Sequence, residues 1–139
     1  MTTDLVRSLN EFARDKHPGL VGVEIETCDV DLVTGRMTIG KEVVAGNNMV
    51  WAPVIITLAD WLCACGMSPN LPKGAGFTTI ELKSNFLGTA AVGEVVTGRA
   101  TPLHKGRNTH VWDAVIRNET KDKTIALFRC TQMILHPRA

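Results

Sequence analysis

The sequence lacks a charge excess, so it gives no sign of a polyanionic partner. Its 15 Lys and Arg residues nearly balance 14 Asp and Glu residues, and the formal net charge is +1. A chain of this kind has no overall electrostatic attraction to nucleic acid, and an anionic ligand would have to meet a local group of cations. We therefore expect no nucleic-acid partner.

Long apolar runs are also missing. No uninterrupted run reaches the length of about 18 residues that indicates a membrane-spanning helix. Residues 1–19 mix charges among their apolar positions, so they lack the apolar core of a signal peptide. We expect no membrane span, no export signal and a cytoplasmic location.

Cysteine and histidine patterns are absent as well. Cys63 and Cys65 make a C-x-C pair on an expected helix, where residues two apart point to different sides. Neither a zinc pattern nor a disulfide framework emerges, so reduced, buried thiols in a cytoplasmic protein are predicted. His17, His110 and His136 show no pairing spacing, and we expect no metal.

What is present fits one ordinary globular domain. The 139 residues are 45% hydrophobic and 21% charged, and no repeat, low-complexity segment or internal linker divides them. Apolar periodicity predicts the order α-β-β-α-β-β-β-β. A helix over 3–16 precedes a hairpin of strands 21–27 and 36–43. After a long apolar helix, strands are predicted over residues 77–87, 94–103, 109–118 and 124–135.

The apolar helix is the most informative segment. Its sequence, WAPVIITLADWLCACG, runs from Trp51 to Gly66 and should be buried on all sides. Pro53 suits the first helical position and Gly66 suits the stop. One helix of this kind favours an α+β fold, in which a single antiparallel sheet wraps the helix over a domain of residues 1–139.

This helix carries one carboxylate, Asp60. An unpaired buried carboxylate is costly, so Asp60 must be neutral, well hydrogen-bonded or functional. As a purely structural residue it would need a donor such as Thr57. Thr57, one turn earlier, is expected to bond its own helix carbonyl instead.

Five short motifs carry a family resemblance. They are T-L-A-D-W in the helix, then T-T-I-E-L-K-S-N-F-L, V-G-E, H-K-G-R and C-T-Q-M-I-L. Together, over about residues 20–135, they resemble the acyl-CoA thioesterases of the phenylacetic-acid-degradation type. The resemblance implies a hotdog fold, hydrolysis of a small or medium acyl-CoA without a cofactor, and a homodimer that assembles into a homotetramer.

The helix entrance departs from that family, whose members place His-Gly-Gly there after a loop asparagine. In this sequence the three positions are Trp51, Ala52 and Pro53. Ala52 keeps a backbone N–H, which a helix N-terminus aims at a developing oxyanion. The loop asparagine falls at Ala45 by strict count, whereas the amides present are Asn47 and Asn48.

The resemblance also implies site roles. Asp60 is the general base or nucleophile. The Ala52 N–H polarises the carbonyl with help from Asn48 or Asn47. Thr79 holds the attacking water or the carboxylate. Strand alternation places Thr79 on the face of Phe77, Glu81, Lys83 and Asn85. Each residue also has an ordinary structural use, as a helix cap or as a β-branched strand residue.

The remaining predicted contacts concern the substrate. Trp51, Trp61 and Trp112 are the candidates for lining an acyl pocket, although core packing is the usual role of tryptophan. Pro53 is expected to contact the substrate beside Trp51. Lys105 and Arg107, in the H-K-G-R turn, would meet the phosphates of coenzyme A. A solvated turn is the alternative for these cations.

Asp60 lies ~10.5 Å along the helix axis from Pro53, too far to act on a carbonyl held at its own helix entrance. A site shared by two antiparallel helices of a dimer is therefore predicted. Two other functions stay open. A hotdog dehydratase or hydratase needs a histidine beside an acid, and this helix has none. A non-catalytic acyl-CoA binder would explain the missing His-Gly-Gly.

Overall fold

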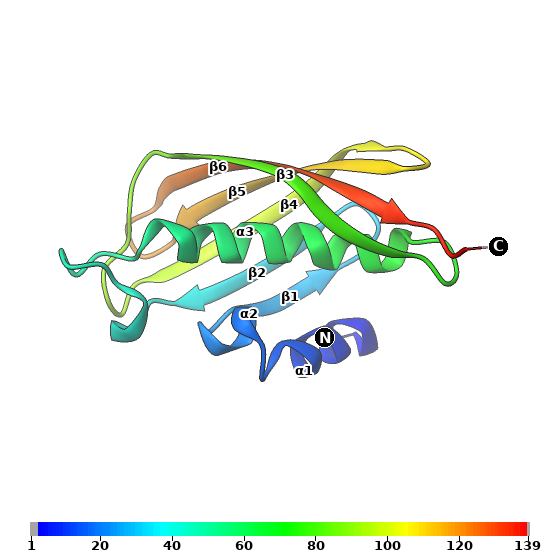
Figure 1. Ribbon diagram of the computed structural model, residues 1–139. Coiled ribbons are helices and arrows are strands. Elements are labelled where there is room, and N and C mark those ends of the chain that lie inside the picture. Colours follow the sequence, from blue (N-terminus) through cyan, green and yellow to red (C-terminus); the bar gives the residue numbers. More distant parts are fainter. Residues whose placement is uncertain (1–2, 139) are drawn as a thin grey trace.

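The computed structural model describes residues 3–138, and one long helix packed on a six-stranded antiparallel sheet lies at its centre (Figure 1). The helices are α1 (Asp4–Ala13), α2 (His17–Leu20) and α3 (Ala52–Met67). The strands are β1 (Glu24–Cys28), β2 (Val33–Thr38), β3 (Gly76–Phe86), β4 (Val95–Lys105), β5 (Thr109–Asn118) and β6 (Lys123–Leu135). The predicted α+β fold, with one sheet wrapped round an apolar helix, is confirmed.

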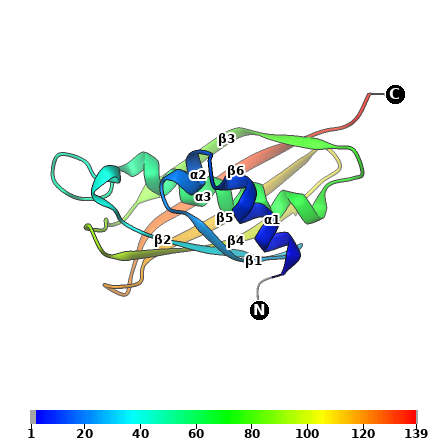
Figure 2. The same ribbon diagram turned by 90° about the horizontal axis from the view of Figure 1, so that it is seen from below.

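The sheet order is β1-β2-β4-β5-β6-β3, so β3 and β1 form its two edges. Helix α3 packs across β2, β4 and β5. Helix α1 packs against β1, and α2 reaches α3. The two N-terminal helices therefore lie at the β1 edge of the sheet, alongside α3, and are nearest the viewer when the molecule is seen from below (Figure 1 and Figure 2).

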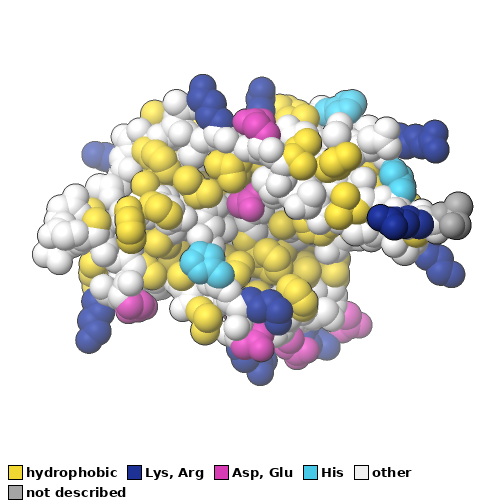
Figure 3. Space-filling model, in the orientation of Figure 1, with side chains coloured by type: hydrophobic (Ala, Val, Ile, Leu, Met, Phe, Trp, Pro, Cys, Tyr) yellow, Lys and Arg dark blue, Asp and Glu magenta, His cyan; other side chains and the backbone are white. Residues whose placement is uncertain are grey.

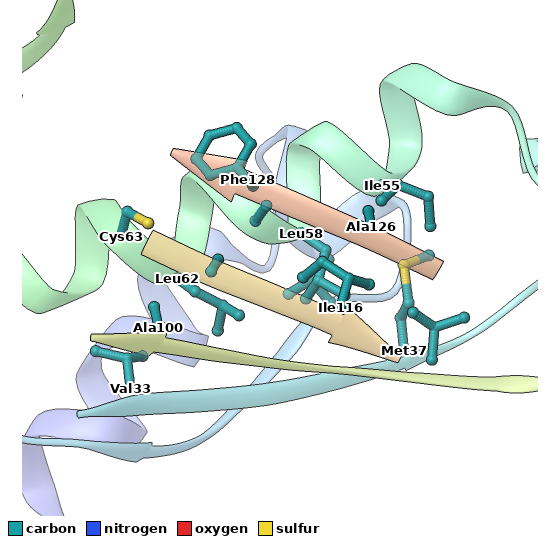
Figure 4. Close-up of a cluster of buried hydrophobic side chains, with 14 of the residues drawn as sticks. Val33, Met37, Ile55, Leu58, Leu62, Cys63, Ala100, Ile116, Ala126 and Phe128 are labelled. Atoms are coloured by element: carbon teal, nitrogen blue, oxygen red, sulfur yellow. The ribbon is translucent and has the colours of Figure 1, made fainter. Parts of the chain in front are cut away.

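The core forms where α3 meets the sheet (Figure 4). Leu58 and Leu62 are fully buried there. Gly35 of β2 pairs with Gly98 of β4, and a Cβ on either glycine would collide with the Leu62 side chain. These two glycines let α3 approach the sheet closely, and this contact fixes the helix that carries Asp60.

Helix α3 differs from the prediction in its end. Gly66 does not end the helix. Its role is in packing, because a Cβ at this position would collide with the ring of Trp112. The helix runs to Met67 and a 3₁₀ turn, Ser68–Asn70, follows. Asn70 Nδ2 donates to the Gly66 carbonyl at 2.8 Å and satisfies one of the last free carbonyls.

Nor is α3 buried on all sides. One stripe, aligned at helical spacing, is half-exposed: Ile56, Thr57, Asp60, Trp61 and Ala64. By length and composition alone, the stretch Ala52–Asn70 could cross a membrane. Half of that stretch is buried inside the protein, so its apolar character is explained by the core.

The first hairpin is shorter than predicted. Its second strand covers Val33–Thr38, whereas residues 41–43 form a 3₁₀ turn. Asp29 closes the connecting turn by accepting N–H bonds from Asp31 and Leu32. A bulge between Ile25 and Thr27 breaks the alternation of β1, so Thr27 is exposed instead of buried.

A second bulge, in β3, decides which side chains face the helix. Thr79 pairs with Gln132 and Glu81 with Thr131, which leaves Ile80 as the extra residue. The prediction that Thr79 shares a face with Glu81, Lys83 and Asn85 is therefore wrong. Beyond the bulge, Lys83 and Asn85 line the outer face of the sheet beside Leu127 and Arg129.

Candidate active site

Asp60 lies on the half-exposed stripe of α3. Thr79, which directly precedes the β3 bulge, points toward the Asp60 side chain. Thr79 Oγ1 donates to Asp60 Oδ1 at 3.0 Å. Burial raises the pKa of the Asp60 carboxyl, while hydrogen bonding acts in the opposite direction, first from Thr79 and then from the Gln132 amide that lies behind Thr79. The arrangement is a partly desolvated carboxylate with one oxygen engaged by a strand hydroxyl, which suits a general base.

Sequence reasoning missed Gln132. This residue of β6 is fully buried, and its Oε1 lies 3.0 Å from Thr79 Oγ1. The sequence contained a signal for it, because Gln132 alternates with Phe128 and Cys130 and therefore falls on the inward, otherwise apolar face of β6. A buried amide in such a position needs partners.

Sequence reasoning also missed His17, because α2 is far from Asp60 along the chain. Its Nε2 lies 2.8 Å from Thr57 Oγ1. The Thr57 hydroxyl already donates to the Pro53 carbonyl at 3.1 Å, as predicted, so His17 is the donor in this pair. A cavity of about 200 Å³ extends from the His17–Thr57 pair to Asp60. It is lined by His17, Pro18, Ile56, Thr57, Asp60, Trp61 and Ala64.

A larger apolar cavity of about 470 Å³ lies beside the first, between α1, α3 and the start of β3. Trp61 and Ala64 line both cavities. The Trp61 ring stacks on Phe12 with centroids 6.4 Å apart. The remaining lining residues are Ser8, Leu9, Cys65, Ser68 and Phe77. Of the three tryptophans, Trp61 therefore borders a cavity, whereas Trp112 is buried in the core.

The predicted residues of the helix entrance lie elsewhere. Trp51 is 61% exposed and caps α3 without a side-chain bond, and Ala52 and Pro53 are also exposed. Eight residues of helix separate Ala52 from Asp60, which is about 12 Å along the axis. Within one chain, the Ala52 N–H and the Asp60 carboxylate are not brought together.

The two loop asparagines shape the loop before that entrance. Asn47 Oδ1 accepts the Met49 N–H at 3.0 Å. Asn48 adopts the left-handed conformation, with φ of 63°, which asparagine tolerates better than most residues. Both are exposed and precede α3, so they belong with Ala52 and not with Asp60.

The predicted cations lie at the β4–β5 turn, at a strand junction as expected. Lys105 Nζ is 2.6 Å from Asp31 Oδ1, so this lysine already has an acidic neighbour. Arg107 is exposed, and its carbonyl contacts His136 Nε2 at 2.9 Å.

The cysteines are free and buried, as predicted: Cys28, Cys63, Cys65 and Cys130. Burial raises the pKa of the Cys28 thiol to about 11, so this thiol is neutral at physiological pH. Within residues 3–138, no group of three or more His, Cys, Asp or Glu side chains is placed to hold a metal ion.

A long apolar helix wrapped by one six-stranded antiparallel sheet defines a hotdog fold, and the single carboxylate of the helix is bound by a strand hydroxyl. The chain matches the model of the Thioesterase superfamily over residues 47–125, and it belongs to that family. The resemblance seen in the motifs is thereby confirmed. The protein is a thioester hydrolase of the acyl-CoA thioesterase group, phenylacetic-acid-degradation type.

Individual relatives agree with this assignment. The chain is 31% identical to the acyl-coenzyme A thioesterase PaaI of Escherichia coli over 85% of this chain and 81% of that protein. It is 24% identical to a 1,4-dihydroxy-2-naphthoyl-CoA hydrolase of Listeria monocytogenes, over 80% of this chain and 89% of that protein. The crystal structure of a Haemophilus influenzae thioesterase superposes with a TM-score of 0.88 at 25% identity, covering 97% and 93% of the two chains.

Proposed function

We propose that the protein hydrolyses the thioester of a small or medium acyl-CoA, with Asp60 as the general base. The observation that carries this proposal is the Thr79–Asp60 hydrogen bond at the edge of a cavity. Thr79 engages Oδ1, which leaves Oδ2 to take a proton from the attacking water. No cofactor is required by this chemistry.

A panel of acyl-CoAs assayed for free thiol release tests the proposal. Hydrolysis releases coenzyme A from at least one substrate. Binding without thiol release would instead indicate the non-catalytic binder. Water addition to an enoyl-CoA without thiol release would indicate the hydratase, for which His17 offers a histidine in the Asp60 cavity that the helix itself lacks. Membership of the thioesterase family supports the first outcome.

The site is shared between two subunits in this proposal, with the partner's helix entrance supplying the oxyanion donor. The first N–H groups of a helix have no acceptor within it, and Trp51 provides no side-chain cap. The Ala52 N–H can therefore face the partner's substrate carbonyl. Asn47, Asn48, Trp51 and Pro53 would contact the same substrate from that side.

Two features of the surface support a homodimer. Strand β3 is an eleven-residue edge strand, and a long uncovered edge invites pairing with another chain. Figure 3 shows hydrophobic side chains gathered over the face of α3 and β3, with Lys and Arg mainly at its rim. Ile80, Leu82 and Phe86 are exposed on β3. A homotetramer would pair two such dimers, and the buried free thiols support a reducing, cytoplasmic location.

The 470 Å³ cavity beside Trp61 is proposed to hold the acyl group. A cavity of about 150 Å³ is enough to bind benzene, so an acyl group of aromatic size can enter this one. The relative named for 1,4-dihydroxy-2-naphthoyl-CoA, whose acyl group is aromatic, supports this proposal.

Filling that cavity should change substrate preference. Ser8 is an exposed residue of α1 that lines it, so Ser8→Phe should lower kcat/KM about tenfold for medium or aromatic acyl-CoAs and leave acetyl-CoA nearly unchanged. Glu11→Phe is the matched control, because Glu11 lines a different surface of α1. Equal losses on acetyl-CoA and on the larger substrates would argue against this acyl site.

Lys105 and Arg107 are proposed to bind the phosphates of coenzyme A. Neutralising both with Lys105→Gln and Arg107→Gln should raise KM about tenfold and change kcat little, because the turn is remote from the carbonyl. An acyl-pantetheine substrate, which lacks the nucleotide phosphates, should be unaffected.

The control for this experiment is Lys121→Gln with Lys123→Gln. It removes the same charge from the β5–β6 turn, at the opposite end of these strands. If the Lys105/Arg107 variant loses kcat/KM equally on acyl-CoA and on acyl-pantetheine, the turn serves folding and not phosphate binding.

A further inference from the structure

Gln132 is a buried amide whose hydrogen bonds lead to the candidate base. Its side chain is completely buried near the C-terminal end of β6, and its amide lies between Thr79 and Cys130. Oε1 is 3.0 Å from Thr79 Oγ1, and Nε2 is 3.4 Å from Cys130 Sγ. Through Thr79, this amide is one hydrogen bond away from Asp60.

The number of hydroxyl protons limits which hydrogen bonds Asp60, Thr79 and Gln132 can form at the same time. Thr79 has a single O–H, yet its oxygen lies 3.0 Å from both Asp60 Oδ1 and Gln132 Oε1. One hydroxyl proton serves one acceptor. An ionised carboxylate is the stronger acceptor, so it takes the Thr79 proton when Asp60 is charged.

Each protonation state of Asp60 then requires its own amide orientation. With Asp60 ionised, a half-turn of the amide places Nε2 against Thr79 Oγ1 and Oε1 against the Cys130 thiol, so every group has a partner. With Asp60 protonated, Asp60 donates to Thr79, and Thr79 donates to Gln132 Oε1. The amide of Gln132 offers both a donor and an acceptor, so the same side chain serves both protonation states.

We propose that Gln132 is a positioning residue for the hydrolysis: it directs the Thr79 hydroxyl to donate to the Asp60 carboxylate. This inference rests on Asp60 being the general base. By occupying the oxygen of Thr79, the amide keeps the hydroxyl proton on Oδ1 and leaves Oδ2 facing the cavity. Gln132 itself does not touch the substrate.

The other ionisable groups around this network are neutral or lie across the cavity. Cys63 of α3 adjoins Cys130, and burial raises the pKa of Cys63 well above its usual range. His110 of β5 is directly opposite Gln132 in the register and buried, and burial lowers its pKa. His17 lines the cavity from α2. Asp60 is therefore the group expected to set the acid limb of the pH profile.

The test is Gln132→Met, which keeps the side-chain volume and removes both hydrogen-bonding groups. We expect kcat to fall about tenfold with KM nearly unchanged. The acid limb of kcat/KM should move to higher pH, because Asp60 loses support for its charged form. Gln132→Asn, whose shorter amide withdraws from Thr79, should give the same shift and serves if the methionine variant does not fold.

Two comparisons separate positioning from simple destabilisation. Because Gln132 acts through Thr79, adding Gln132→Met to Thr79→Val should cost little beyond Thr79→Val alone. The control is Asn118→Leu, which removes another buried amide, one that donates to the Thr89 carbonyl. It should lower the melting temperature and leave the acid limb in place.

An unchanged acid limb in folded Gln132→Met, or losses that multiply with Thr79→Val, would overturn the proposal for Gln132. Those outcomes leave Asp60 untouched as the base. Failure of the proposed function itself has a different signature, namely normal turnover in a folded Asp60 variant.

Discussion

Asp60→Asn is expected to lower kcat by roughly 10²–10⁴-fold, the usual contribution of a general base. Asparagine keeps the shape of the side chain and can still accept the Thr79 hydrogen bond that the structure places on Oδ1. It cannot take a proton from water, so the chemical step is lost while substrate binding remains. Steady-state thiol release, together with acyl-CoA binding by the variant, measures both effects.

The same substitution should not weaken the fold at neutral pH. Burial raises the pKa of Asp60 in the folded protein, so the folded state binds this proton more tightly than the unfolded state. Stability from this group is therefore present at low pH and is lost as pH rises through the folded pKa. Above that window the carboxylate opposes folding, and Asp60→Asn should melt at an equal or higher temperature than wild type.

Asp113→Asn is the contrasting control for the melting experiment. Asp113 receives two hydrogen bonds from Arg129, at 2.6 and 2.9 Å, on the outer face of the sheet. Removing its charge should leave stability unchanged or slightly lower, with activity retained. A folded Asp60→Asn protein with near-normal turnover would end the mechanism proposed here.

The sequence predicted the features that follow from local pattern. The late strands agree within one or two residues, because their alternation is long and each is bounded by Gly or polar turns. Asp60 stood out because a carboxylate is costly in an apolar helix. Thr79 came from the family motif, and its contact with Asp60 agrees with the expectation that its hydroxyl holds the carboxylate.

The missed features depend on contacts that no local pattern contains. A bulge at Ile80 moves the side chain of every later residue of β3 to the opposite face of the sheet. The alternation of apolar and polar residues along a sequence cannot reveal where a strand gains an extra residue. His17 reaches Thr57 only because α2 docks on α3. Gly66 looked like a helix stop, whereas its role is set by Trp112, a partner from β5.

A mixture of Asp60→Asn and Ala52→Pro chains is expected to regain activity that neither parent has. In a dimer with shared sites, each mixed pair has one site with both defects and one with neither. Random pairing makes about half of the dimers mixed, so the mixture should recover about a quarter of wild-type turnover. Co-expression with two different affinity tags isolates the mixed dimers for direct assay.

The Ala52→Pro change is chosen because it removes one N–H with little strain. Proline is well tolerated in the first turn of a helix. Trp51, which would precede it, already has the extended backbone that proline requires, with φ −71° and ψ 136°. Ala52→Gly, which keeps the N–H, is the matched control and should remain active.

A second pairing makes the result decisive. Asp60 and Thr79 meet within one chain, so they belong to the same half of a shared site. Mixing Asp60→Asn with Thr79→Val therefore places one defect in each of the two sites, and no activity should return beyond that of Thr79→Val alone. Recovery with Ala52→Pro but not with Thr79→Val requires that the helix entrance act across the dimer. Mixed Asp60→Asn and Ala52→Pro dimers that stay as inactive as their folded parents would show that it does not.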